Sequence, residues 1–241
     1  MSSVNNFRRE GDSALQRVGA QPDALTGKNN PDAVAVPPQV QPSLDAFHAA
    51  HQPYAAACDV ADAAHVKRDA ALEAIGVAAT MVKERVETLA AKLVDAKLGT
   101  RMRPLAAFST HSPSELCKLR YEAQQLASVK LADAVLAQAT DPAVKKAAHE
   151  VKAAADALEA KIQGLVNPQA MLAGAMATRD ALLPAWHDAW REFKTQLRAA
   201  WSHEPGKPAF VLAPPPAIVL GKKKGGKKAV AAAAATTSAV P

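Results

Sequence analysis

Two pairs of acidic and histidine residues have a spacing that could bind a metal. Asp45 and His48 are three positions apart, as are Asp62 and His65, so each pair would share one face of a helix. Di-iron helical bundles use Glu-x-x-His motifs on separate helices, together with further glutamates. Here both pairs fall in the same helical region, where they cannot face each other. We therefore expect no metal site and no cofactor.

Nucleophilic chemistry has little support either. Ser109, Ser112 and Ser114 lie close to His111, but the pattern at Ser112 predicts a helix cap instead. The chain contains no Gly-x-Ser-x-Gly motif, no phosphate-binding loop and no dinucleotide-binding glycine pattern. Its two cysteines are far apart in the sequence, without the spacing of a zinc site or a redox dithiol. We expect a protein that is not an enzyme.

The excess positive charge lies near the C-terminus. The formal net charge is +6, although residues 44–204 carry nineteen positive and nineteen negative side chains. The residues that we predict to contact a polyanion are Lys222, Lys223, Lys224, Lys227 and Lys228. This run resembles the Lys/Ala tails of bacterial linker-histone-like proteins, which implies weak, salt-sensitive binding of DNA or RNA. The alternative is a tail that only keeps the protein in solution.

Two apolar clusters are candidates for binding another protein. One is an aromatic stripe with helical spacing, made of Trp186, Trp190, Phe193 and Trp201. The other surrounds a run of prolines and consists of Phe210, Val211, Leu212, Ile218, Val219 and Leu220. Tryptophan is favoured in interface hot spots, and a free tail rarely exposes so many large apolar side chains. Alternatively, the stripe is a core layer that contacts Tyr54 or Phe108, and the tail segment packs on its own bundle.

Long helices are the elements that would position these residues. A heptad pattern of apolar residues runs through Leu72, Ile75, Ala79, Val82, Val86, Leu89, Leu93 and Ala96. It predicts a helix from Tyr54 to about Leu98, with a weaker N-terminal half. Proline follows Ser112, Asp141 and Asn167, which predicts three further helix starts. The connections at Asp141 and Asn167 are short, which favours antiparallel neighbours.

These patterns predict an all-α fold. Residues 43–204 would form an antiparallel bundle or coiled coil of three or four long helices. Residues 1–42 are rich in proline and read as an extended or disordered arm, and residues 205–241 carry the apolar segment and the basic tail. Roughly a quarter of the residues are alanine and only 4% are aromatic, which suits closely packed long helices better than a compact enzyme core.

The arms and the missing catalytic set favour a structural or scaffolding subunit of a larger assembly, whose arms contact neighbouring proteins or further copies. A nucleic-acid-associated protein that acts through its tail is the first alternative. A coat protein is the second, since the Ala-rich composition is similar to that of phasins, which cover polyester granules. No secretory signal or membrane-spanning stretch is expected, so the cytoplasm or the interior of a particle such as a virion is the expected location.

Overall fold

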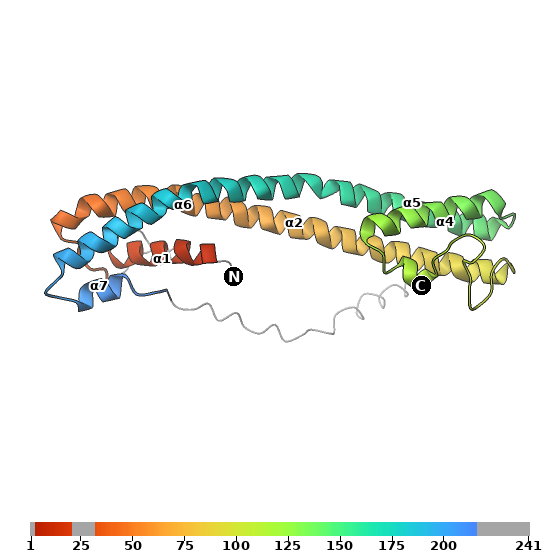
Figure 1. Cartoon of the computed structure of the whole chain (residues 1–241), viewed down its shortest axis with the longest axis horizontal. Coiled ribbons are helices and arrows are strands. Elements are labelled where there is room, and N and C mark those ends of the chain that lie inside the picture. The colour runs from red at the N-terminus through yellow and green to blue at the C-terminus, as the bar shows by residue number, and fades with distance from the viewer. Residues whose placement is uncertain (1–2, 21–31, 216–241) are drawn as a thin grey trace, which may run out of the picture.

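The computed structural model describes residues 3–20 and 32–215, and all regular structure within them is helical, as predicted. The elements are α1 (Ser3–Arg17), the short 3-10 helix η1 (Pro38–Val40), α2 (Gln41–Asp95), α3 (Pro113–Leu116), α4 (Tyr121–Gln138), α5 (Pro142–Gly164), α6 (Val166–Ala200) and α7 (Gly206–Val211). The 55 residues of α2 make it about 80 Å long. The other helices are arranged along it (Figure 1).

Helix α2 starts earlier than the sequence predicted. The predicted start at Tyr54 follows Pro53 directly, but the helix begins at Gln41 and continues through this proline. Proline removes one helical N–H, which leaves the carbonyl of Ala49 without its usual donor. Both residues are exposed, so water can take the place of the lost donor.

The predicted antiparallel turn at Asn167 is wrong. Helix α5 ends at Gly164, only Leu165 separates it from α6, and both helices run in the same direction along α2 (Figure 1). Pro168 lies in the first turn of α6, where a missing N–H costs nothing. The turn at Asp141 is confirmed, since the Asp141 carboxylate accepts from the Ala143 N–H at 2.7 Å and α5 runs back along α4.

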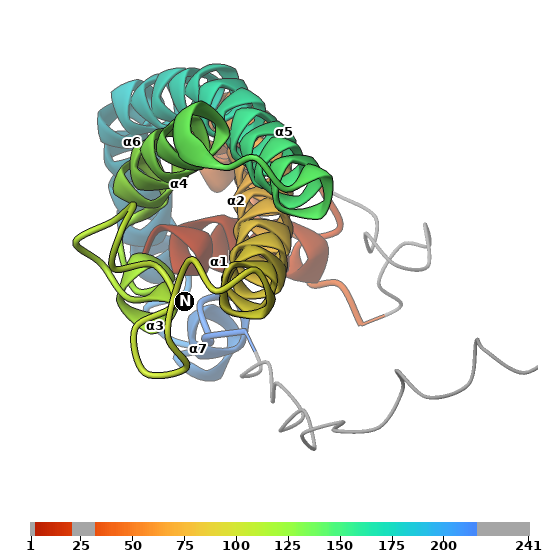
Figure 2. The same cartoon turned by 90° about the vertical axis from the view of Figure 1, so that its right-hand side faces the viewer.

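Apolar side chains form two separate cores. The hairpin lobe combines the C-terminal part of α2 with α3, α4 and α5, which surround one centre in the view along the long axis (Figure 2). Its core contains the predicted heptad residues from Ile75 to Leu93. The terminal lobe combines the N-terminal part of α2 with α1, η1, α7 and the end of α6.

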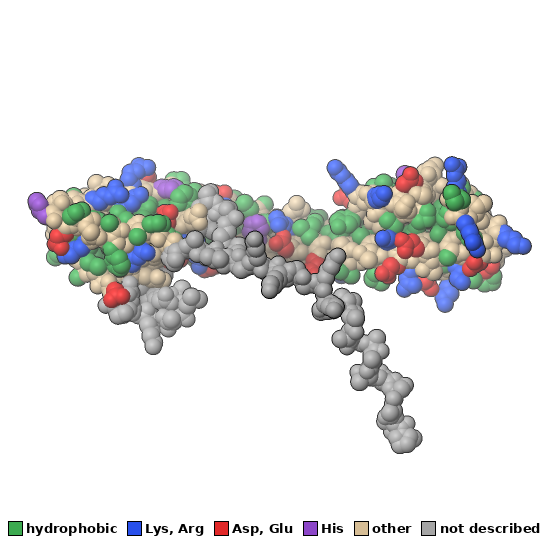
Figure 3. Space-filling model, turned by 90° about the horizontal axis from the view of Figure 1, so that it is seen from below, with side chains coloured by type: hydrophobic (Ala, Val, Ile, Leu, Met, Phe, Trp, Pro, Cys, Tyr) green, Lys and Arg blue, Asp and Glu red, His purple; other side chains and the backbone are tan. Residues whose placement is uncertain are grey.

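Between the lobes lies a waist made of residues 65–74 of α2 and 166–178 of α6. None of these α2 residues is buried, and on the α6 side only Leu172 is. Leu72, the first residue of the predicted heptad stripe, is 41% exposed because it lies in the waist. Seen from below, the molecule narrows between the two lobes (Figure 3).

The prediction of an extended or disordered arm over residues 1–42 is wrong for residues 3–17 and 38–42, which are helical. Residues 3–17 form α1, and Ala14 and Leu15 are buried in the terminal lobe. Phe7 is half-buried against the same cluster. These side chains recur seven and eight positions apart, which places them on one face of a helix. The polar residues between them conceal this period in the sequence.

Candidate partner-binding site at the terminal lobe

The aromatic stripe on α6 is buried inside the terminal lobe. Trp186, Trp190, Phe193 and Trp201 are all buried. Phe47 of α2 lies among them: its ring stacks on Phe193 with centroids 5.5 Å apart and lies 4.8 Å from Trp190. These aromatic side chains are therefore occupied by the protein's own helices, which is the alternative that the sequence left open.

Tyr54 also belongs to this cluster. Its ring centroid lies 5.7 Å from that of Trp186, whereas Phe108 packs in the hairpin lobe. Burial raises the pKa of the Tyr54 hydroxyl and that of the neighbouring Cys58 thiol. Both groups therefore stay protonated at neutral pH, and Cys58 is not poised as a thiolate nucleophile.

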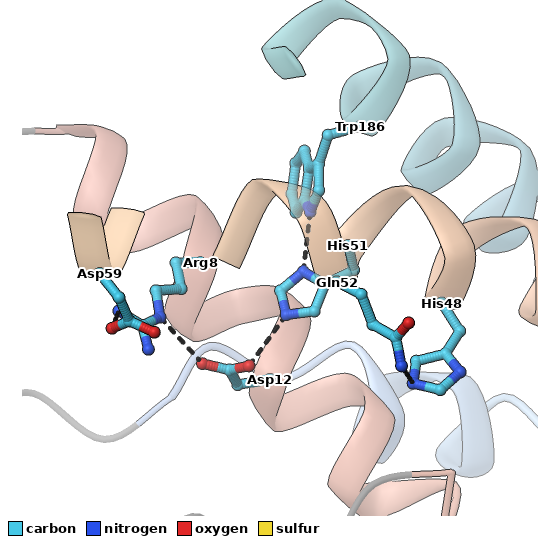
Figure 4. Close-up of polar contacts among 7 residues, drawn as sticks. All are labelled: Arg8, Asp12, His48, His51, Gln52, Asp59 and Trp186. Atoms are coloured by element: carbon cyan, nitrogen blue, oxygen red, sulfur yellow. Dashed lines mark hydrogen bonds and ion pairs between the residues drawn. The ribbon is translucent and has the colours of Figure 1, made fainter. Parts of the chain in front are cut away.

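A buried histidine joins α1, α2 and α6 at the edge of the cluster. His51 is 1% exposed, and its Nδ1 accepts a hydrogen bond of 2.9 Å from the Trp186 indole N–H (Figure 4). Because Nδ1 must accept, the neutral ring carries its proton on Nε2 and donates it to the Asp12 carboxylate at 2.8 Å. Arg8 lies beside Asp12 and forms a 2.6 Å ion pair with Asp59 of α2. We call the triad of Asp12, His51 and Trp186 the latch.

The latch has the acid–histidine pair of a catalytic triad but not its chemistry. In a triad, the second ring nitrogen takes a proton from a nucleophile. Here that nitrogen already accepts from an indole N–H, which is not a nucleophile. Within residues 3–20 and 32–215, no three His, Cys, Asp or Glu side chains come together as a metal site would require. The latch therefore holds α1 against the other two helices.

Of the three latch residues, the sequence singled out only Trp186, as part of the aromatic stripe, and it missed Asp12 and His51. His51 follows Phe47 by four positions and precedes Tyr54 by three, which places all three on one face of α2. Gly11 is the other recognisable signal, because it brings α1 so close to His51 that an added Cβ would overlap the imidazole ring. A lone histidine on an apolar face and a lone glycine are too common to predict such a contact.

Part of the predicted docking segment packs on its own lobe. Arg17 of α1 donates to the carbonyls of Phe210 and Val211 at 3.0 and 3.3 Å, and also to that of Ala213. Val211 is buried, Leu212 is half-buried, and Phe210 remains 42% exposed. The remaining candidates lie outside the described residues: Ile218, Val219, Leu220, Lys222, Lys223, Lys224, Lys227 and Lys228.

Comparison with protein families, characterised proteins and solved structures finds no match to this chain. Among the helices described, none is both long and apolar enough to cross a bilayer. The two lobes, the waist and the ends of the chain are therefore the features that bear on function.

Proposed function

We propose that this protein is a non-catalytic structural or scaffolding subunit of a larger assembly. The observation that carries the proposal is the division into two separately packed lobes joined by a waist of two helices. A single compact core would bury more apolar surface per residue than this elongated shape does. A shape that places the two lobes at opposite ends of a helix about 80 Å long suits a spacer, with α2 and the aligned helices α5 and α6 as its antiparallel coiled-coil axis.

The ends of the chain are the proposed contacts to neighbouring subunits. Phe210 presents an exposed ring on the terminal lobe, next to the Arg17 side chain, whose guanidinium lies 5.5 Å from the ring centroid. An exposed aromatic ring with a stacked arginine combines two residue types that are favoured in interface hot spots. Residues 216–220 would extend this contact, and the five lysines beyond them would touch a polyanion. The assembly would lie in the cytoplasm or inside a large particle.

Affinity purification from the native source, followed by mass spectrometry and size measurement, tests the proposal. We expect a stoichiometric protein partner, and a particle that is larger than the chain alone and keeps its size after nuclease treatment. Phe210→Ala should lower recovery of the partner, whereas Met102→Ala, which removes a fully exposed side chain on the other lobe, should not. A monomer that purifies without any partner would contradict the proposal.

A nucleic-acid-associated protein is the second candidate, and the charge distribution favours it. Because residues 44–204 are balanced in charge, the five tail lysines dominate the attraction for a polyanion. Deletion of residues 221–228 should abolish a gel shift with DNA or RNA that weakens as salt is added. A shift that survives this deletion would refute tail-mediated binding.

A surface-coating role similar to that of phasins is the third candidate. It is supported by residues 162–178, which contain no charged side chain although most of them are exposed. Co-sedimentation of the protein with polyester granules would distinguish this role from the other two. Loss of co-sedimentation in Ala170→Glu, which places a charge on this face, would identify the contact.

A further inference from the structure

Helix α2 has a second apolar face, which no other described element covers. We call it the outer stripe; it consists of Ala63, Val66, Ala70, Ala74, Val77 and Met81. The spacings of 3, 4, 4, 3 and 4 keep these residues on one side of a helix. Val66, Val77 and Met81 are 69%, 59% and 49% exposed. Eighteen steps of 1.5 Å make the outer stripe about 27 Å long.

The outer stripe faces away from the aligned helices α5 and α6. Each residue turns a helix by about 100°, which places Val66 and Val77 about 180–200° from the core residue Ile75. Helix α4 contacts a different side of α2, since Gln124 donates to the Ala79 carbonyl and the Tyr121 hydroxyl approaches Gly76. The ion pair of Arg8 in α1 with Asp59 of α2 lies before the first residue of the stripe. An approaching helix can therefore reach the stripe.

Opposite charges border the outer stripe. Asp62 and Glu73 lie on one edge, and Lys67 lies on the other. Within the part of the chain that the structure describes, neither Asp62 nor Lys67 forms an ion pair. Asp62 precedes Lys67 by five positions, which is the separation at which flanking residues of two parallel coiled-coil helices face each other.

We propose that the outer stripe binds the outer stripe of a second copy of this chain, with the two α2 helices parallel. In this arrangement Asp62 of each copy faces Lys67 of the other, and two-fold symmetry forms the pair twice. In an antiparallel arrangement, the edge that carries Asp62 and Glu73 would instead face the same acidic edge of the other copy. The inference rests on the proposed function, because it names one contact by which the spacer would assemble.

The contact should be reversible. Half of the outer stripe is alanine, and its length is short compared with interfaces that bury about 800 Å² on each partner. The dimer population should therefore rise with protein concentration. Trapping the dimer covalently avoids this dependence.

Cysteine crosslinking tests the geometry. Under mild oxidation Val66→Cys should form a covalent dimer, because the same residue of two parallel helices meets itself across the seam. Ala170→Cys is the matched control, since this residue is exposed on α6. Cys117→Ser removes the native half-buried thiol from both proteins. Equal rates of crosslinking for Val66→Cys and Ala170→Cys would overturn the proposal.

Charge reversal tests the direction of the helices. Asp62→Lys and Lys67→Asp should each lower the dimer fraction in sedimentation of the full chain, and the combined variant should restore it. In an antiparallel dimer, Asp62→Lys alone would strengthen association, which would contradict the parallel arrangement. Val77→Glu should abolish dimers without changing helix content by circular dichroism, whereas Ala177→Glu on the exposed side of α6 should not.

The two proposals fail in different ways. If Val66→Cys does not crosslink preferentially but a stoichiometric partner is recovered from the native source, this inference is wrong and the assembly role stands. If the purified chain dimerises through the outer stripe and no further component is recovered, the larger assembly is wrong and the second-copy contact stands.

Discussion

Replacing Trp186 with phenylalanine tests whether the latch holds α1 in place. Phenylalanine keeps ring contacts with Phe47 and Tyr54 but removes the N–H that His51 accepts. A buried acceptor left without its donor costs about 1–3 kcal/mol. The smaller ring adds about 1 kcal/mol for the space that it leaves. We expect a loss of about 2–4 kcal/mol, a large share of the stability of a typical domain.

Chemical denaturation followed by circular dichroism would measure this loss, and hydrogen exchange would locate it. Because the two lobes have separate cores, amides of α1 should exchange faster while those of α4 keep their rates. Trp201→Phe is the matched control: it shrinks a buried ring of the same lobe, and no hydrogen bond to His51 is involved. Equal losses in Trp186→Phe and Trp201→Phe would refute the latch, as would unchanged exchange in α1.

Three further predictions follow from local contacts. Gly11→Ala should push α1 away from the buried His51, so the amides of α1 should exchange faster. Gly174→Ala adds a methyl group in open space and should stabilise α6 by about 0.5–1 kcal/mol in thermal unfolding. Ser128→Ala should leave the free energy of unfolding unchanged or raise it, because no residue that the structure describes forms a hydrogen bond with the buried hydroxyl. Ser43→Ala should lower the free energy of unfolding by about 1 kcal/mol, because the Ser43 hydroxyl donates to the Val40 carbonyl at 2.8 Å. The reverse order of the two effects would contradict this reasoning. Hydrogen bonds from the backbone N–H and the side chain of Ser112 lower the pKa of the Glu115 carboxyl. The ionised Glu115 therefore stabilises the fold above the ordinary pKa of glutamate, and this stabilisation is lost as the pH falls through the lowered pKa. Glu115→Gln should therefore flatten the pH dependence of hairpin-lobe stability on the acid side, and an identical pH profile would argue against it.

The sequence predicted the helices more reliably than their directions. Apolar periodicity located the heptad residues from Ile75 to Leu93, since burial on one face is what selects them. It could not show that α6 continues along the line of α5, because a proline in the first turn of a helix is compatible with either a reversal or a continuation. Helix α1 was missed because polar residues separate its few apolar ones, and contacts with distant residues of α2 and α6 stabilise it.

The candidate site was predicted only in part. Spacing identified the aromatic residues of α6, but it could not decide between a core layer and a partner surface. Their place in a core layer follows from Phe47 of α2, whose ring packs against Trp190 and Phe193. Phe47 lies more than a hundred positions earlier in the sequence, so spacing within α6 could not reveal this contact. Sequence patterns also cannot show which apolar residues stay exposed. The alanines and valines of the outer stripe look like core residues in the sequence, but the arrangement of the helices leaves them uncovered.

The separation of the two lobes also sets the order in which the chain can assemble. Helices α4 and α5 are joined by three residues, so their contacts need little loop closure. Phe47 and Phe193, which stack in the terminal lobe, are 146 positions apart (193 − 47). We therefore expect the hairpin lobe to form first as a nucleus, the waist to close along α2 from that end, and the terminal lobe to form last. The same order in reverse makes the terminal lobe the place where unfolding begins.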